Sequence, residues 1–227
     1  MPETCEGLYR IALDRISAQG QEWARVAISA LKWITFSKEL LPAAALQHAL
    51  SVQGNGGDIN FDNVMDLTKL VAVCGGLITF DQESDVIRLV HYTTQRYLER
   101  VFSGDVEIAR TCLSYLSNPA FSEPFTNEKQ LKDHLQKYKL SDYASRYWSE
   151  HVRAAAEGQF HSEILQAFGR QGTRDAVFQL AEYSSSEVWY WYRHPPNITI
   201  LHFASIYGLS NLCQSLLDNH HRSERVY

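Results

Sequence analysis

Apolar residues at helical spacing dominate the first part of the chain. They run from Leu8 to Ile16 and from Trp23 to Ile34, which predicts two amphipathic helices separated by the sequence SAQGQ. A third helix is expected to open near Pro42, because proline is tolerated in the first turn of a helix. The pattern therefore predicts a helical start to the fold.

The pattern then changes to short apolar runs. A fourth helix is expected to end at a glycine pair just before LITF (77–80), and VIRLV (86–90) follows after the acidic sequence DQESD. Both runs have strand length and are rich in β-branched residues, which predicts a β-hairpin. One more helix follows it. Three or four helices, a hairpin and another helix are the order of a winged-helix fold, so residues 1–104 are predicted to be a winged-helix domain.

Helical periodicity resumes after residue 104, apart from a connection at 118–127 that contains two prolines. Residues 105–183 carry no catalytic signature and are predicted to be a helical spacer domain. Residues 184–197, SSSEVWYWYRHPPN, cannot form an amphipathic helix face and are predicted to be an aromatic linker. In this linker, Trp189 and Trp191 either seal the seam between the neighbouring segments or form an exposed patch for a protein partner.

The segment ITILHFASIYGLSNLCQSLLDN resembles an ankyrin repeat, although Ile200 stands where that family has proline. The residues at family positions are Thr199, Leu201, His202, Ala204, Gly208, Leu216 and Leu217. The resemblance implies that the threonine and the histidine hydrogen-bond the turn at the head of the repeat. A single repeat cannot bury its own apolar face, so it either caps the upstream helices or belongs to a longer array. Residues 198–227 are thus predicted to be a partial ankyrin repeat, and the expected fold class is mostly α.

The distribution of charge narrows the class of partner. The 227 residues carry a formal net charge of -5, and residues 58–85, which hold the would-be recognition helix and wing, contain six acidic residues and one lysine. DNA phosphates would be repelled there, so nucleic acid is not an expected partner.

Neither a membrane location nor a disulfide framework is expected. No apolar run reaches the ~18 residues of a spanning helix, and the first residues lack the features of a signal peptide. The four cysteines lie far apart without a CxxC pair, which favours buried reduced thiols. We therefore expect an intracellular protein, cytoplasmic or nuclear.

Longer stretches of the chain resemble a known family. They are ISALKWITFSKELLPAAALQHALSV, LTKLVAVCGGLITFDQESDVIRLVHYTTQRYLER, IARTCLSYLSNPAF and LSDYASRYWSEHVR. With the ankyrin-like segment they are similar, in order and spacing, to the middle of fungal NACHT and ankyrin-repeat proteins, relatives of the nucleotide-switched STAND receptors. In that family the winged helix locks or releases the nucleotide domain and the repeats recognise a ligand. The resemblance implies that this chain couples the two.

The resemblance also assigns a role to one histidine. A Met-His-Asp motif closes the winged helix of the switch receptors and places its histidine against the nucleotide phosphate; the matching residues here are Val90, His91 and Tyr92. The aspartate is not kept, and no G-x-x-x-x-G-K-[ST] loop is present to cradle phosphates, so neither a nucleotide domain nor a cofactor is expected. His91 is thus a vestigial nucleotide-sensor candidate. The alternative hypothesis is that the Val90-His91 edge is a docking surface left from the parent architecture.

No residue spacing supports catalysis or a metal site. The sequence has no H-E-x-x-H, no G-x-S-x-G and no cysteine pair at metal-ligand spacing, so an enzyme is not expected. We expect a non-enzymatic regulatory module that binds other proteins, such as a NACHT-domain or ankyrin-containing relative. Two alternatives stay open, namely an ankyrin-type transcription coregulator and a truncated product with no independent activity.

Overall fold

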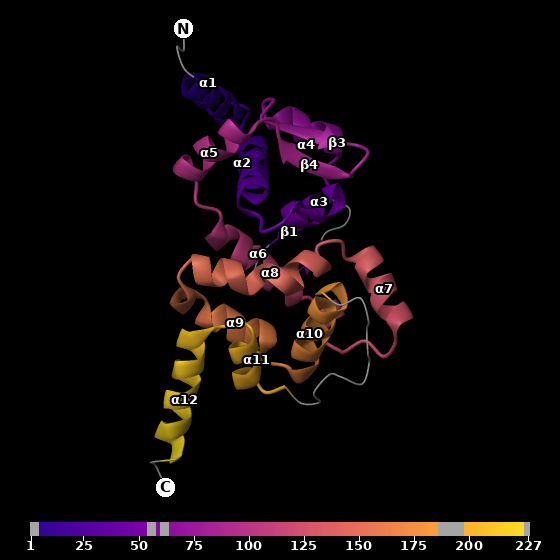
Figure 1. Cartoon of the computed structure of the whole chain (residues 1–227), viewed down its shortest axis with the longest axis vertical. Helices are drawn as coiled ribbons and strands as arrows, with labels where there is room; N and C mark the ends of the chain where they lie inside the picture. The colour runs from indigo at the N-terminus through magenta and orange to yellow at the C-terminus, as the bar shows by residue number, and fades with distance from the viewer. Residues whose placement is uncertain (1–4, 54–57, 60–63, 186–197, 225–227) are drawn as a thin grey trace. The chain divides into compact units, whose positions relative to one another are not determined.

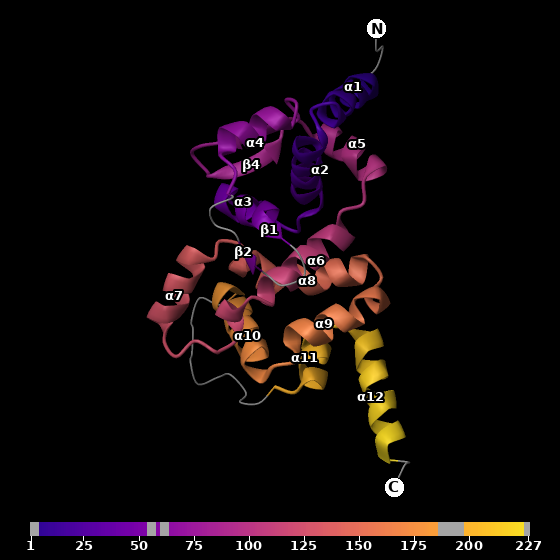
Figure 2. The same ribbon diagram turned by 180° about the vertical axis from the view of Figure 1, so that it is seen from behind.

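The computed structural model describes residues 5–53, 58–59, 64–185 and 198–224. The chain forms two compact units that divide between Gly104 and Asp105, and residues 53–58 group with the second unit. Both units are mostly helical (Figures 1 and 2). The prediction of a mostly α-helical chain with a small β-hairpin is confirmed. None of the helices formed by the described residues combines the length and the hydropathy needed to cross a membrane.

Helices and a small hairpin make up the first unit. Its elements are α1 (Cys5–Ser17), α2 (Gln21–Phe36), α3 (Ala43–Ser51), α4 (Leu67–Val73), β3 (Ile78–Asp81), β4 (Val86–Leu89) and α5 (Tyr92–Val101). Two strands of two residues each, β1 (Val52–Gln53) and β2 (Asp58–Ile59), lie where the sequences of the two units interleave. The helix α2 contacts α1, α3, α4, α5 and β4, and it carries the buried side chains of Leu31 and Trp33. It is therefore the central element of this unit.

The hairpin is joined by a third extended segment. The strands β3 and β4 are antiparallel, and Pro42, just before α3, forms an isolated antiparallel bridge to Val86 of β4. The Ala43 N–H donates to the carbonyl oxygen of Asp85 at 2.8 Å, and Asp85 has a φ of 53°, in the left-handed region that tight turns use. The chain order is thus α2, a bridging segment, α3, α4 and the hairpin.

Residues 105–185 and 198–224 of the second unit form helices and the turns between them. Its elements are α6 (Asp105–Leu116), η2 (Pro119–Phe121), α7 (Glu128–Lys137), α8 (Ser141–Ala154), η3 (Glu157–Phe160), α9 (His161–Phe168), α10 (Gln171–Ser185), α11 (Ile200–Ile206) and α12 (Ser210–Glu224). The helices α6 and α8 lie side by side in Figures 1 and 2 and form the largest helix contact of the unit. Cys112 of α6 and Trp148 of α8 are fully buried. The C-terminal helices α11 and α12 belong to the same compact unit as α6 to α10.

An aromatic cluster attaches α11 to the spacer helices. Trp148 of α8, Phe168 of α9, Phe203 of α11 and Tyr207 at the end of α11 are all buried. The ring centroids of Phe168 and Phe203 are 4.8 Å apart, and those of Trp148 and Tyr207 are 4.9 Å apart. Aromatic rings at such separations add to the free energy gained from burying their area. The apolar face of α11 is therefore covered by α8 and α9.

Three charged side chains hold the same segment by its backbone. The Arg174 Nε–H donates to the carbonyl oxygen of Ile198 at 2.8 Å, ahead of α11. Arg153 donates to the carbonyl oxygen of Tyr207, between α11 and α12. The buried carboxylate of Glu157 accepts the backbone N–H of Leu212 at 2.7 Å, in the first turn of α12. The bonds to Tyr207 and Leu212 satisfy backbone groups at helix ends, where intrahelical partners are missing.

Some apolar residues of the predicted helices do not face inward. Leu8 and Trp23 were expected on buried stripes and are exposed, and so is Val101 of α5. Each lies in a terminal turn of its helix, Leu8 at the start of α1, Trp23 at the start of α2 and Val101 at the end of α5. An apolar stripe predicts only the direction in which a side chain points. The side chain is buried only if a neighbouring element also extends far enough to cover it.

Candidate functional site

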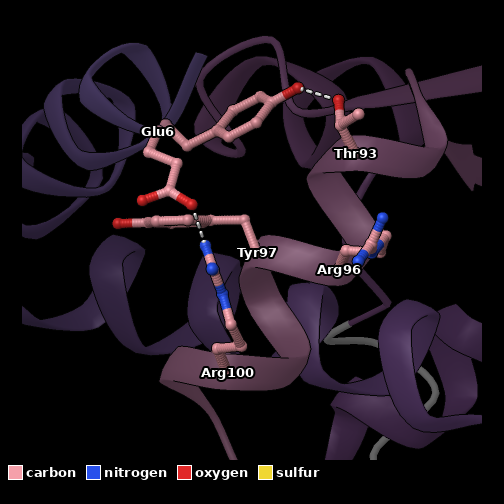
Figure 3. Close-up of a pocket in the computed structure, with 6 residues that line it drawn as sticks. Glu6, Thr93, Arg96, Tyr97 and Arg100 are labelled. Atoms are coloured by element: carbon pink, nitrogen blue, oxygen red, sulfur yellow. Dashed lines mark hydrogen bonds and ion pairs between the residues drawn. The ribbon is translucent and has the colours of Figure 1, made fainter. Parts of the chain in front are cut away.

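A groove between α1 and α5 in the first unit gathers polar and aromatic side chains (Figure 3). Its volume is about 310 Å³. The lining residues are Glu6, Tyr9, Thr93, Arg96, Tyr97 and Arg100. The tyrosine rings of Tyr9 and Tyr97 are 5.4 Å apart between centroids and form the apolar part of the groove.

His91 caps α5 and contacts Thr93, one of the residues that line the groove. Its Nδ1 accepts the backbone N–H of Thr93 at 3.2 Å, as an N-cap side chain does, so Nδ1 carries no proton. The Thr93 hydroxyl is 2.7 Å from the same nitrogen and must therefore donate to it. The Tyr9 hydroxyl, 2.6 Å from the Thr93 oxygen, then donates in its turn. The result is a directed chain, Tyr9 to Thr93 to His91, that ties α1 to the first turn of α5.

The same tautomer fixes what the exposed His91 ring offers to its surroundings. With Nδ1 occupied as an acceptor, the neutral ring carries its proton on Nε2, which is then a donor. The neighbouring side chains of Val90 and Tyr92 are 48% and 66% exposed. The rings of His91 and Tyr92 lie 4.5 Å apart. We call Val90, His91 and Tyr92 the α5 entrance; it is an apolar edge with one fixed hydrogen-bond donor.

The two arginines of the groove differ in their partners. Arg100 forms an ion pair with Glu6 at 2.5 Å, and its guanidinium lies 5.8 Å from the centroid of the Tyr97 ring. Both members of this pair are exposed, so it contributes at most about 1 kcal/mol to stability. Arg96, one turn earlier on α5, is exposed and has no ion-pair partner among the described residues. Figure 3 shows Arg100 reaching Glu6 beside the Tyr97 ring, while Arg96 points away from that pair.

The predicted turn residues of the ankyrin-like segment are brought together. Thr199 caps α11, because its Oγ1 accepts the His202 N–H at 3.3 Å. The His202 Nδ1 lies 2.9 Å from the same oxygen. Ala204 is buried, and Gly208 has a φ of 68° at the turn into α12, where a side chain would be strained. These contacts fix the start of α11 and the turn into α12.

The remaining predicted residues of this region are less enclosed. Leu201 and Leu216 are half-buried, and Leu217 is exposed on α12. Trp189 and Trp191 lie outside the described residues, as does most of the predicted linker.

A buried polar chain occupies the second unit. The His151 Nδ1 is 2.7 Å from Asp105 Oδ1, and its Nε2 is 2.7 Å from the Tyr143 hydroxyl. His151 and Tyr143 are buried beyond the reach of solvent. His151 is thus a core histidine with both ring nitrogens hydrogen-bonded. Its hydrogen bonds join α8 to the start of α6.

The described cysteines are free thiols in apolar surroundings. Cys74 and Cys112 are buried and Cys213 is half-buried. Burial raises the pKa of the Cys74 thiol to about 12 and raises that of Cys112 further. The described part of the chain holds no group of three or more histidine, cysteine or acidic residues suited to a metal ion.

The chain matches no known protein-family model, no curated protein and no solved structure.

The sequence pointed to His91 but not to the groove lined by Thr93. The groove needs Tyr9 and Thr93, which are 84 residues apart in the chain. The available signal was the sequence RYLER, which places Arg96 and Arg100 on one face of a helix.

Proposed function

We propose that this chain is a non-enzymatic regulatory module that binds other proteins through the α5 entrance and the adjoining groove. The observation that carries the proposal is the exposure of Val90 and Tyr92 on either side of a histidine that is fixed by its cap. Large apolar side chains grouped around an oriented polar group are characteristic of protein-binding surfaces.

The chain order supports a winged-helix assignment for residues 1–104. A winged helix runs helix, strand, two helices and a hairpin, and the observed order is α2, the Pro42 bridge, α3, α4, β3 and β4. The Thr199–His202 bond and the turn at Gly208 support a partial ankyrin repeat at residues 198–227. On this proposal, residues 105–183 are the spacer of a module derived from a NACHT and ankyrin receptor.

Charge supports a protein rather than nucleic acid as the partner. The hairpin carries Asp81, Glu83 and Asp85, and Arg88 of β4 is paired with Asp81. An acidic wing repels phosphates, whereas it leaves protein contacts open.

Photo-crosslinking tests the proposal. The full chain with p-benzoyl-phenylalanine in place of Tyr92 is expected to give a discrete adduct with another protein in cells. The matched control places the same group at Leu165, an exposed leucine of α9 in the second unit. Val90→Asp should weaken the adduct because it introduces a charge into the apolar edge. Identical adducts from both positions, or an adduct indifferent to Val90→Asp, would refute the proposal.

A second variant separates the two roles of His91. His91→Asn keeps a side-chain acceptor that can cap α5 and removes the imidazole. If the adduct persists unchanged, His91 serves only the helix; if it weakens while the circular dichroism spectrum is unchanged, the ring itself contacts the partner.

A further inference from the structure

We propose that the groove between α1 and α5 receives an acidic side chain of the protein partner, with Arg96 as its principal contact. The inference rests on the proposed function and specifies the chemistry of the partner segment as aspartate- or glutamate-bearing peptide.

The groove already holds one carboxylate. Arg100 of α5 binds the Glu6 carboxylate of α1 beside the Tyr97 ring. A carboxylate of a partner would be bound by the same kind of contact. Arg96 and Arg100 are four residues apart on α5 and therefore neighbours on one face of the helix. Arg96 lines the same groove with five guanidinium donors and no ion-pair partner among the described residues. Its guanidinium points away from the Glu6–Arg100 pair in Figure 3, so a partner carboxylate would meet it at a separate point of the groove.

The charges and the size of the groove favour a carboxylate over a phosphate. Its lining carries two positive charges and one negative charge, from Glu6, so its net charge is +1. A dianionic phosphate would be repelled by Glu6 about twice as strongly as a monoanionic carboxylate at the same distance. The volume of about 310 Å³ is at the lower end of small-molecule sites, a size suited to one or two side chains. The rings of Tyr9 and Tyr97 offer an apolar wall to the methylene groups of an acidic side chain.

Fluorescence anisotropy of the full chain with a labelled peptide of alternating glutamate and glycine tests the inference. Glutamine replaces glutamate in the matched peptide. We expect the glutamate peptide to bind, its glutamine counterpart to bind at least about tenfold more weakly, and Arg96→Gln to weaken binding about fivefold. Arg170→Gln, which removes an exposed arginine of the second unit, is the control and should have no effect.

One variant is expected to gain affinity. Glu6→Gln removes the competing carboxylate and frees Arg100, so the glutamate peptide should bind two- to fivefold more tightly. A misfolded protein cannot produce this gain. The inference is overturned if Arg96→Gln binds like the wild type, if the two peptides bind equally, or if inorganic phosphate binds as tightly as the peptide.

The outcome is separable from that of the proposed function. A crosslink from position 92 that survives Arg96→Gln undiminished would refute the role of the groove while leaving the α5 entrance as a docking surface.

Discussion

Acid should destabilise this protein through one buried histidine. His134 of α7 is 9% exposed, and its ring lies 4.7 Å from that of Phe121, 4.9 Å from that of Phe125 and 4.5 Å from that of Tyr138. Its Nε2 is buried without a hydrogen-bond partner. Burial, together with the nearby charge of Lys137, lowers the pKa of His134 from 6.5 to about 4. The imidazole of His134 therefore binds a proton less readily in the folded protein than in the unfolded chain.

The sign and size follow from proton linkage. Between pH 6.5 and about 4 the unfolded state binds more protons than the folded state, so the free energy of unfolding falls as the pH falls. The two pKa values predict a loss of about 1 kcal/mol at pH 5.5 and about 3 kcal/mol in all once the pH is below 4. Above pH 7 this contribution to the free energy of unfolding vanishes, because His134 is neutral in both the folded and the unfolded state.

Urea unfolding at a series of pH values measures this effect. The wild type and His134→Leu should be compared from pH 7.5 to pH 4.5, because titration of other groups cancels in the difference. The leucine variant also avoids an unpaired buried nitrogen and should be close to the wild type at neutral pH. Its relative stability should then rise as the pH falls. A difference that stays flat with pH, or a pKa of His134 above 6 by NMR titration, would refute the reasoning.

Further predictions concern helix ends and thiols. Glu157→Ala should lower the free energy of unfolding by about 2 kcal/mol, because the Leu212 N–H loses a charged acceptor, and Glu157→Gln should lower it by less. Equal urea midpoints for the wild type and both variants would contradict this prediction. Thr199→Val should cost about 1 kcal/mol by removing the cap of α11, whereas Thr199→Ser should restore it, as thermal denaturation can show. Cys74 and Cys112 should be unreactive toward a thiol reagent in the native state and react in guanidinium chloride, and rapid native labelling of either would be inconsistent with their raised pKa.

The elements of the first unit could be predicted because their signals are local. The hairpin was expected at 77–80 and 86–90, and β3 and β4 lie at 78–81 and 86–89. The fourth helix begins at Leu67, because the side chain of Asp66 caps α4 at that point. Capping thus placed a boundary that hydrophobic spacing alone could not.

Features that depend on distant segments could not be predicted. The helix α7 was not singled out, since its buried positions are few and one of them, His134, is polar. The groove likewise depends on how α1 lies against α5, and the α1 sequence alone does not indicate which of its side chains are covered. His91 was found through a resemblance; its cap and its link to Tyr9 came only from the fold.

The C-terminal helix pair is held by the aromatic side chains of α11 and, in addition, by hydrogen bonds to its backbone. Arg174 donates to the carbonyl oxygen of residue 198, Arg153 donates to that of residue 207, and Glu157 accepts the N–H of residue 212. These backbone atoms are present whichever side chain the residue carries. Only a proline at 212, which lacks the N–H, would break one of these bonds. Outward-facing side chains of α11 and α12 can therefore be substituted without breaking these hydrogen bonds. New recognition surfaces can arise at those positions while the supporting helices stay unchanged.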